Sequence, residues 1–417
     1  MVADFTTGVG TPDLVQYPML AVLTDKNAAR LFVGQLVSQV CDKMMTVGLI
    51  WVLTQRASLA AIPWFLAVSA LPHLLLAWRA GHWTNLLGPL KTVIWADWIR
   101  AAIFAGLAFA WPRVPPGAEL AVLFAASFAA NFASALFNPA MMSLPLHLGD
   151  AEVLQQLTAV LDSCFSLGSI VGPVCSALLY PWIGLRGLFL FNGLSFAFAA
   201  ILESGVLTRL PASAEEAAGA AGSAASGMGE LLRGDSLLRF MLGGFLGMNI
   251  FFGPLLVFLP LFAKAAYGGT IGTLASLETS LGAGTALGGV ILTLVRFDSR
   301  TGVKISAGMG LMAVSYVAFT LTRVPWQGCA CLAALGFFLA TANVFILNLF
   351  QTRPAPRDVP TVMSLVNLIS TASLPVSMGV LGLLVGRVEV RSLALACSCM
   401  LLLATAILVS SRELRQV

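Results

Sequence analysis

The chain has 417 residues, of which 58% are hydrophobic and only 10% are charged, and its formal net charge is +4. Because soluble domains carry roughly 25% charged residues, this composition excludes water as the main solvent of the protein. The basic residues are scattered through short segments instead of gathering on one face, so a nucleic-acid partner is not expected.

Apolar runs of about 20 residues recur along the chain, which is the length that a helix needs to cross a ~30 Å hydrocarbon layer. Transmembrane β-barrels instead alternate in ~10-residue segments. The sequence therefore predicts an all-α integral membrane protein of about twelve transmembrane helices. Breaks at charged residues, proline and glycine place the spans near 29–55, 60–79, 92–111, 118–141, 154–180, 185–207, 237–263, 271–295, 303–322, 326–350, 360–385 and 391–410.

These spans divide into two six-helix halves, at 29–207 and 237–410. Residues 208–236 between them are rich in Ala, Gly, Ser and Glu, which is the composition of a flexible linker. We expect this linker, the N-terminal segment 1–28 and the tail 411–417 to be cytoplasmic. The N-terminus lacks the features of a cleaved signal peptide. The seven cysteines fall inside apolar runs with no nearby histidine, so we expect packing residues and no metal or cofactor.

The distribution of Lys and Arg supports this orientation, since cytoplasmic loops carry the excess. With both termini and the linker inside, thirteen basic residues lie on that side and seven on the other, and three lie within or at the edges of spans. We therefore expect a multi-pass protein of a bacterial cytoplasmic (inner) membrane with both termini in the cytoplasm.

The segment after the second span carries a glycine-containing motif. It reads G-H-W-T-N-L-L-G-P-L-K from Gly81 to Lys91. This resembles the loop signature of the major facilitator superfamily, in which a Gly is followed by an acid, a basic residue, a second Gly and further basic residues. Asn85 replaces the acid and Leu86 the first basic residue, so the charge-relay latch that the resemblance implies is altered. Gly88 keeps its place, because a tight turn favours a residue without a Cβ.

The fifth span contains a second motif, with Gly168 and Gly172 four residues apart and Pro173 next to them. It is similar to the antiporter motif of exporters in the same superfamily. Small residues at this spacing allow two helices to approach closely, and proline weakens the helix where bending is needed. Any membrane helix can contain such a motif, so close packing alone also explains it.

Further segments resemble one branch of that superfamily, the enterobactin exporter-like proteins. They are Phe137 to Pro145, Arg30 to Lys43, Ala96 to Ala101 and Val362 to Leu365. The resemblance covers the first half well and the second half thinly, and it implies a major facilitator fold and a siderophore or drug exporter. Within Ala96 to Ala101, Asp97 and Arg100 are three residues apart on one helix, so we expect the two to neutralise each other.

Asp42 is the main candidate for a coupling or substrate site. A charge at mid-membrane costs about 2.5–3.5 kcal/mol, so an acid at this depth indicates a function that offsets the cost. Gln35 and Gln39 precede it at seven and three residues, so the three side chains share one stripe of the first span. Proton coupling needs a carboxylate that gains a proton when buried and releases it when water enters. The alternative is an acid that is neutralised by the adjacent Lys43.

Other polar residues at mid-span depth are secondary candidates. Asp162 lies in the fifth span, and Glu278 is the acid deepest in the second half. A buried amide is costly unless it meets another helix or a wet cavity, which adds Asn131, Asn249 and Asn343. Glu203, near the end of the sixth span, is expected to be interfacial, and His73 to be a packing residue.

These features favour a proton-coupled exporter of a small amphipathic organic molecule, such as a siderophore or a drug, which works as a monomer by alternating access. A lysophospholipid transporter is a second hypothesis. A third is an assembly factor or sensor that kept the fold and lost transport, which the altered motif at Asn85 and Leu86 supports. An enzyme is not expected, because no nucleophile and base form a cluster in the sequence.

Overall fold

The computed structural model describes residues 24–77, 79–147, 151–207, 235–294, 301–355 and 358–410. The predicted segment 1–28, linker 208–236 and tail 411–417 lie mostly or entirely outside these residues. Within the described ranges the protein is all-helical, apart from one isolated bridge between Val385 and Val388.

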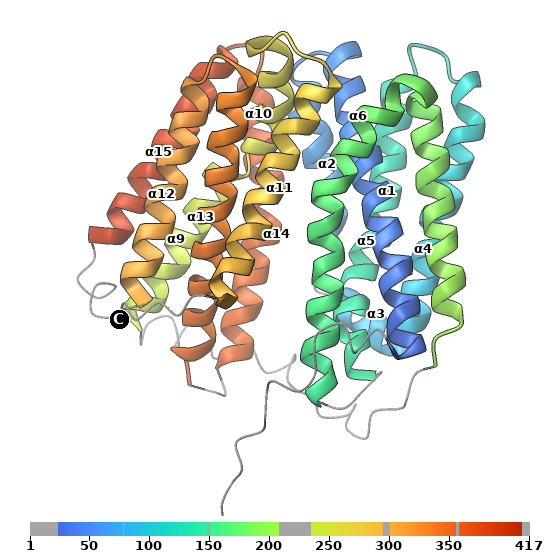
Figure 1. Cartoon of the computed structure of the whole chain (residues 1–417), viewed down its shortest axis with the longest axis horizontal. Helices are drawn as coiled ribbons and strands as arrows, with labels where there is room; N and C mark the ends of the chain where they lie inside the picture. Colours follow the sequence, from blue (N-terminus) through green and yellow to red (C-terminus); the bar gives the residue numbers. More distant parts are fainter. Residues whose placement is uncertain are drawn as a thin grey trace, which may run out of the picture.

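The N-terminal half is built from six α-helices and two short 3₁₀ turns (Figure 1). They are α1 (Lys26–Arg56), α2 (Ala61–Leu76), α3 (Ala80–Leu87), α4 (Pro89–Ala110), η2 (Trp111–Arg113), α5 (Glu119–Ser143), η3 (Leu144–His147) and α6 (Ala151–Ser204). Asp25 begins α1 as its N-cap, since its carboxylate accepts from the backbone N–H groups of Asn27 and Ala28 at 2.8 and 3.0 Å. α6 contains the predicted fifth and sixth spans, which are separated by a sharp turn at Gly184 with φ +59°.

The C-terminal half continues the pattern of long apolar helices. They are α9 (Ser236–Phe252), α10 (Leu255–Leu261), the π-helical turn η4 (Phe262–Ala266), α11 (Ile271–Leu294), α12 (Thr301–Leu321), α13 (Pro325–Thr352), α14 (Val359–Leu384) and α15 (Val390–Ser410). The predicted seventh span is broken at Gly253 and Pro254, between α9 and α10. Proline has no backbone N–H for the helical ladder, so a break at this point is expected.

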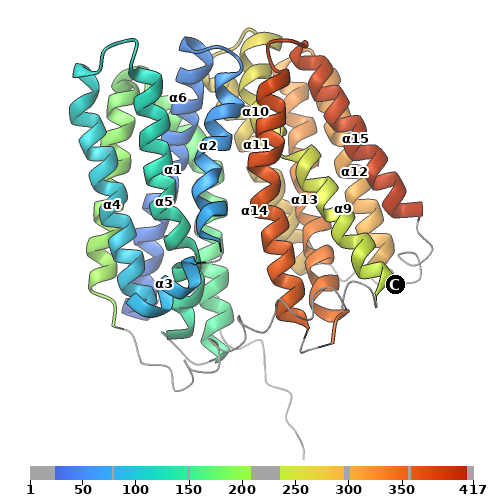
Figure 2. The same cartoon turned by 180° about the vertical axis from the view of Figure 1, so that it is seen from behind.

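The predicted fold class is confirmed. Nine helices in the described residues are long and apolar enough to cross a membrane. One of these, Gln156–Ser204, contains the turn at Gly184, and α2 is a shorter apolar helix of 16 residues. This arrangement agrees with about twelve passes. The main difference from the sequence-based expectation is α3, a helix in place of the predicted loop, which lies beside α4 and α5 (Figure 2).

Residues 80–87 contain no proline or glycine except Gly81, so nothing interrupts helix formation until Gly88. Gly88 has φ +84° and separates α3 from α4, and Pro89 then opens α4. The turn is therefore at Gly88 alone. The side chains of Gly81 and Asn85 lie outside the described part of the structure, whereas Lys91 is exposed in the first turn of α4.

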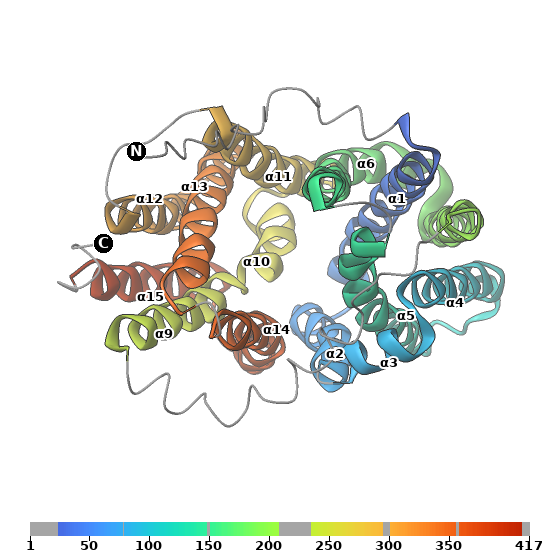
Figure 3. The ribbon, with the colours of Figure 1, turned by 90° about the horizontal axis from the view of Figure 1, so that it is seen from below.

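The two halves stand side by side, with α11 beside α6 and α14 beside α2 (Figure 3). α1 begins, α6 ends and α9 begins on one side of the molecule, which we call the linker side (bottom of Figure 1). Several contacts join the halves farther from that side. The Lys264 ammonium donates to the carbonyl of Thr54, and Thr279 Oγ1 donates to the carbonyl of Ile170 at 3.2 Å.

Candidate functional site

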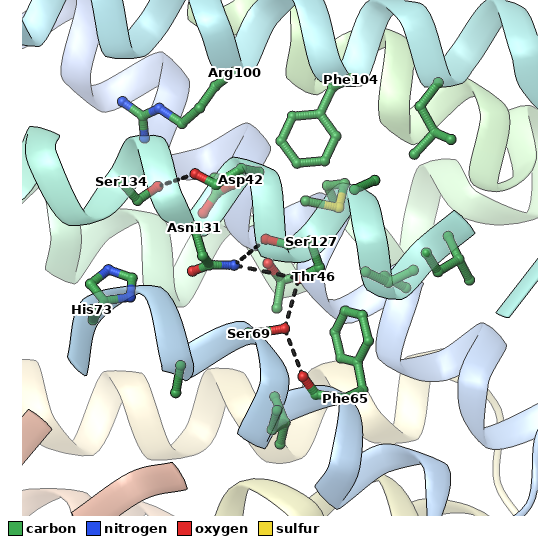
Figure 4. Close-up of a pocket in the computed structure, with 18 of the residues that line it drawn as sticks. Asp42, Thr46, Phe65, Ser69, His73, Arg100, Phe104, Ser127, Asn131 and Ser134 are labelled. Atoms are coloured by element: carbon green, nitrogen blue, oxygen red, sulfur yellow. Dashed lines mark hydrogen bonds between the residues drawn. The ribbon is translucent and has the colours of Figure 1, made fainter. Parts of the chain in front are cut away.

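A cavity of about 460 Å³ lies inside the N-terminal half, with α14 of the other half on one wall (Figure 4). Its volume falls within the roughly 300–1,000 Å³ of small-molecule pockets. α1, α2, α4, α5, α6 and α14 all contribute to its lining. A cavity that is lined by both halves changes shape whenever the halves move, which is the property that a transport site needs.

Asp42 on α1 provides a carboxylate at this cavity. It is half-buried, and Asn192 Nδ2 on α6 donates to its Oδ1 at 3.3 Å. Asn192 is itself fully buried and holds one carboxyl oxygen of Asp42, which lines the cavity. Lys43 is next in sequence, yet its ammonium lies over the ring of Phe165 at 5.5 Å to the ring centroid.

Small polar side chains from α2 and α5 form a second wall. Ser69 Oγ and Ser127 Oγ are 2.7 Å apart, and Asn131 Nδ2 donates to the carbonyl of Ser127 at 2.9 Å. His73 is one turn from Ser69 along α2 and also lines the cavity, as does Ser134 on α5. The hydroxyl and amide groups are largely satisfied by their own helices, so this wall is polar without adding a permanent charge.

Arg100 on α4 is the one arginine among the residues that line the cavity. Its guanidinium pairs with Asp97 and lies between the rings of Phe137 and Phe196, at 4.2 and 4.1 Å from the two ring centroids. Aromatic faces attract a guanidinium, most strongly where water is excluded. The positive charge is therefore held in place at the cavity edge.

Apart from Thr46, Ser370 and Thr371, the rest of the lining is apolar. It is formed by Met45, Leu49, Phe65, Leu66, Ala70, Phe104, Leu107, Leu123, Ala126, Ala130, Phe189 and Leu374. A ligand that fits would bury mostly hydrophobic surface, at roughly 25 cal/mol per Å² removed from water. Asp42, Asn131, His73 and Arg100 would fix its orientation. This chemistry suits an amphipathic organic molecule better than a polyanion, which needs several cationic partners.

Of the candidates expected from the sequence, Asp42 and Asn131 lie at the cavity. The others lie elsewhere. Gln35 is buried against Glu203, and Asp162 on α6 is exposed. Asn249 donates from α9 to the carbonyl of Phe245 at 2.8 Å, and Asn343 is half-buried on α13.

Gln39, Gly168 and Gly172 lie where α1 and α6 pack together. A Cβ on Gly168 would be 3.1 Å from the backbone of Gln39, and one on Gly172 would be 2.5 Å from the Cβ of Lys43. Pro173 is buried next to this contact. Both glycines thus occupy places where a side chain would push two helices of the same half apart.

Glu278 on α11 is half-buried and interacts electrostatically with Lys43 on α1, across the junction of the two halves. No ion pair within 4 Å joins these two residues in the described structure. An acid of one half and a base of the other attract each other across the surface where the two halves meet.

One expectation from the sequence needs correction, because His73 lines the cavity instead of only packing. Glu203, which was expected near the membrane interface, is fully buried in the last turn of α6. Ser69, Ser127 and Ser134 were not foreseen as lining residues. The spacings Ser69 to His73 and Ser127, Asn131, Ser134 place small polar groups on one face of a helix, and this is the signal that could have found them.

Comparison with known proteins decides the family. The family model described as the Major Facilitator Superfamily matches residues 31–376. The chain belongs to the major facilitator superfamily. Among its curated relatives, the macrolide efflux protein A of Streptococcus pyogenes is 24% identical over 373 residues, covering 87% of this chain and 90% of that protein. A proposed bacilysin exporter of Bacillus amyloliquefaciens is 23% identical over 316 residues, covering 75% and 77% of the two chains.

Solved structures of two transporters share the fold. A bacterial homologue of the human lysosomal transporter Spinster, in an inward-facing and unoccupied conformation, superposes with a TM-score of 0.70 at 14% identity, covering 93% of this chain and 97% of that one. The human organic anion transporter MFSD10 gives 0.64 at 15% identity, covering 94% and 100%. The chain is thus a multi-pass member of a transporter family and not of an enzyme family.

Proposed function

We propose that this superfamily member is a proton-coupled exporter of a small amphipathic organic molecule in a bacterial cytoplasmic membrane. The observation that supports it is the cavity, because its apolar walls contain a half-buried carboxylate, a histidine and one held arginine. The names of the relatives, a macrolide efflux protein and a bacilysin exporter, favour export over import.

In this proposal the two halves, 29–207 and 237–410, rock about the cavity as a monomer, with the termini and the linker in the cytoplasm. Asp42 binds a proton or a cationic group of the substrate, but not both at once, since one carboxylate can neutralise only one positive charge. Competition for a single site is sufficient to couple efflux to proton entry. The resemblance to enterobactin exporters adds siderophores to macrolides and bacilysin as candidate substrates.

The test is efflux from proteoliposomes with an imposed pH gradient. The panel is a macrolide, bacilysin, a siderophore and, for the lipid hypothesis, a lysophospholipid. We expect gradient-driven efflux of at least one of the first three by the wild type, and Asp42→Asn to lose this dependence on the gradient while it still exchanges substrate across the membrane. Exchange without a gradient reports a folded, binding-competent protein.

Glu389→Gln is the matched control, because Glu389 is an exposed acid far along the chain, between α14 and α15. Asp162→Asn and Glu278→Gln test the other two acids in the same assay. Two outcomes contradict proton coupling at Asp42. One is efflux by the wild type that does not depend on the pH gradient, and the other is efflux that depends on the gradient equally in wild type and in Asp42→Asn. Movement of the lysophospholipid alone favours the lipid transporter, and movement of nothing in the panel favours a role without transport.

A further inference from the structure

Two acids outside the cavity, Asp97 on α4 and Glu203 in the last turn of α6, are buried together. Both side chains have no exposed surface. Gln35 on α1 is also buried, and its Nε2 donates to Glu203 Oε1 at 2.8 Å. Residues from three helices therefore meet at one point inside the N-terminal half, although they are far apart in the sequence.

The hydrogen bonds at this point are incomplete. Arg100 satisfies Asp97 Oδ1, and Gln35 satisfies Glu203 Oε1. Asp97 Oδ2 and Glu203 Oε2 are buried, and neither has a donor among the described residues. The carboxyl groups of Asp97 and Glu203 nevertheless lie within hydrogen-bonding reach of each other. Two carboxylates cannot form such a bond, because neither has a hydrogen to donate.

The charges lead to the same conclusion. With both acids ionised, Asp97, Glu203 and Arg100 sum to a net charge of −1, and neither carboxyl group has surface open to water. An uncompensated buried charge costs several kcal/mol. One proton makes the cluster neutral, and placed between Asp97 Oδ2 and Glu203 Oε2 it also supplies the missing donor. A single proton thus removes both the net negative charge and the lack of a hydrogen-bond donor.

We propose that Asp97 and Glu203 form a proton-binding site that holds one shared proton, distinct from Asp42 and outside the substrate cavity. On binding, a proton adds to one carboxylate oxygen and forms a hydrogen bond to the other acid. On release, the same O–H bond breaks, and no bond to carbon changes in either direction. The role of this site in coupling depends on the proposed function, whereas the proton can be measured without any transport.

Arg100 connects this site to the cavity. The same guanidinium pairs with Asp97 and lines the cavity, and Asp42 is near enough to act electrostatically on Asp97. When the pair holds its proton, Arg100 faces one negative charge there. When the proton leaves, it faces two and is held more tightly. Arg30 lies at the same end of α6, where it donates to the carbonyl of Gly205, two residues after Glu203.

Infrared spectroscopy of the purified full-length protein in nanodiscs can detect the proton directly. A protonated carboxyl group has a C=O stretching band that is separate from carboxylate bands and shifts on exchange into D₂O. We expect wild type at neutral pH to have such a band. Asp97→Asn and Glu203→Gln should each reduce its intensity by the amount that corresponds to one protonated carboxyl group. Asp162→Asn and Glu389→Gln should leave the band unchanged.

Thermal unfolding as a function of pH is the second measurement. Either single variant is neutral without a bound proton, because one carboxylate remains for Arg100. Wild type should therefore lose stability as rising pH removes the shared proton, and both variants should have a flatter profile. A carboxylic acid band of equal size in wild type and both variants overturns the proposal, as does an identical pH profile. These outcomes do not depend on whether any substrate is exported.

Discussion

At the scale of single residues, Arg100 links the buried acid Asp97 to the cavity. It compensates Asp97, lies between two aromatic rings and reaches the cavity edge. Its Nε is buried without an acceptor among the described residues, so the guanidinium is held by charge and stacking more than by complete hydrogen bonding. A lysine could not reproduce this arrangement, because it lacks the planar group that stacks on an aromatic face.

Arg100→Met should destabilise the protein by about 3–5 kcal/mol, since removing one partner of a buried ion pair leaves the other charge uncompensated. Arg100→Lys keeps the charge and loses the stacking, so we expect a smaller loss of about 0.5–2 kcal/mol. Adding Asp97→Asn to Arg100→Met should recover part of the loss. Thermal unfolding in detergent measures all three, and an Arg100→Met protein as stable as wild type would show that the charge of Asp97 is compensated by another group.

At the scale of helices, the glycines of α11 serve two different contacts. A Cβ on Gly284 would be 2.0 Å from the carbonyl oxygen of Ala333, and one on Gly288 would be 2.6 Å from that of Phe337, both on α13 of the same half. A Cβ on Gly282 would instead be 3.0 Å from the carbonyl oxygen of Ser169 on α6. α11 therefore packs on α13 of its own half through one face and meets α6 of the other half through a different face.

Gly284→Ala should lower the stability of the protein by about 1–3 kcal/mol, because an added methyl group overfills a close helix contact. Gly289→Ala is the matched control on the same helix, since nothing lies within 4 Å of the place where its Cβ would be. That change should be neutral or gain up to about 1 kcal/mol from helix propensity. Unfolding by a denaturing detergent compares the two variants. Equal losses of stability would contradict the prediction that the close contact at Gly284 stabilises the packing of α11 on α13.

At the scale of the whole molecule, contacts between the halves hold one conformation. Thr279 reaches Ile170, Lys264 reaches Thr54, and a Cβ on Gly382 of α14 would be 2.9 Å from the indole of Trp64 on α2. Trp64 lies at the start of α2 and Gly382 near the end of α14, both far from the linker side. Opening the cavity on that far side requires these contacts to separate.

Cross-linking the halves tests this requirement. In a background without the native cysteines, Ile170→Cys and Thr279→Cys joined by a short bis-maleimide should stop efflux, because the far side can no longer open. The control is Gly308→Cys with Ala342→Cys, which joins α12 to α13 within one half, where a Cβ on Gly308 would be 3.2 Å from that of Ala342. That link should spare efflux. Unchanged efflux after complete linkage of the first pair would contradict alternating access through this junction.

The sequence by itself determined the fold class, because the length and spacing of apolar runs are imposed by the thickness of the bilayer. It also selected Asp42 and Asn131, since an acid or an amide inside an apolar run is costly wherever the helix stands. Each of these inferences depends on one helix and its solvent, and no knowledge of neighbouring helices is required.

Only the tertiary structure decided which polar residues meet. Gln35, Asp97 and Glu203 are on three helices, and their sequence positions do not indicate which helix faces which. For the same reason the sequence did not predict that Glu203 is buried beside another acid, and it predicted packing for His73, which lines the cavity. Helical periodicity gives the face of a residue on its own helix, whereas the partner of that face is set by packing between helices.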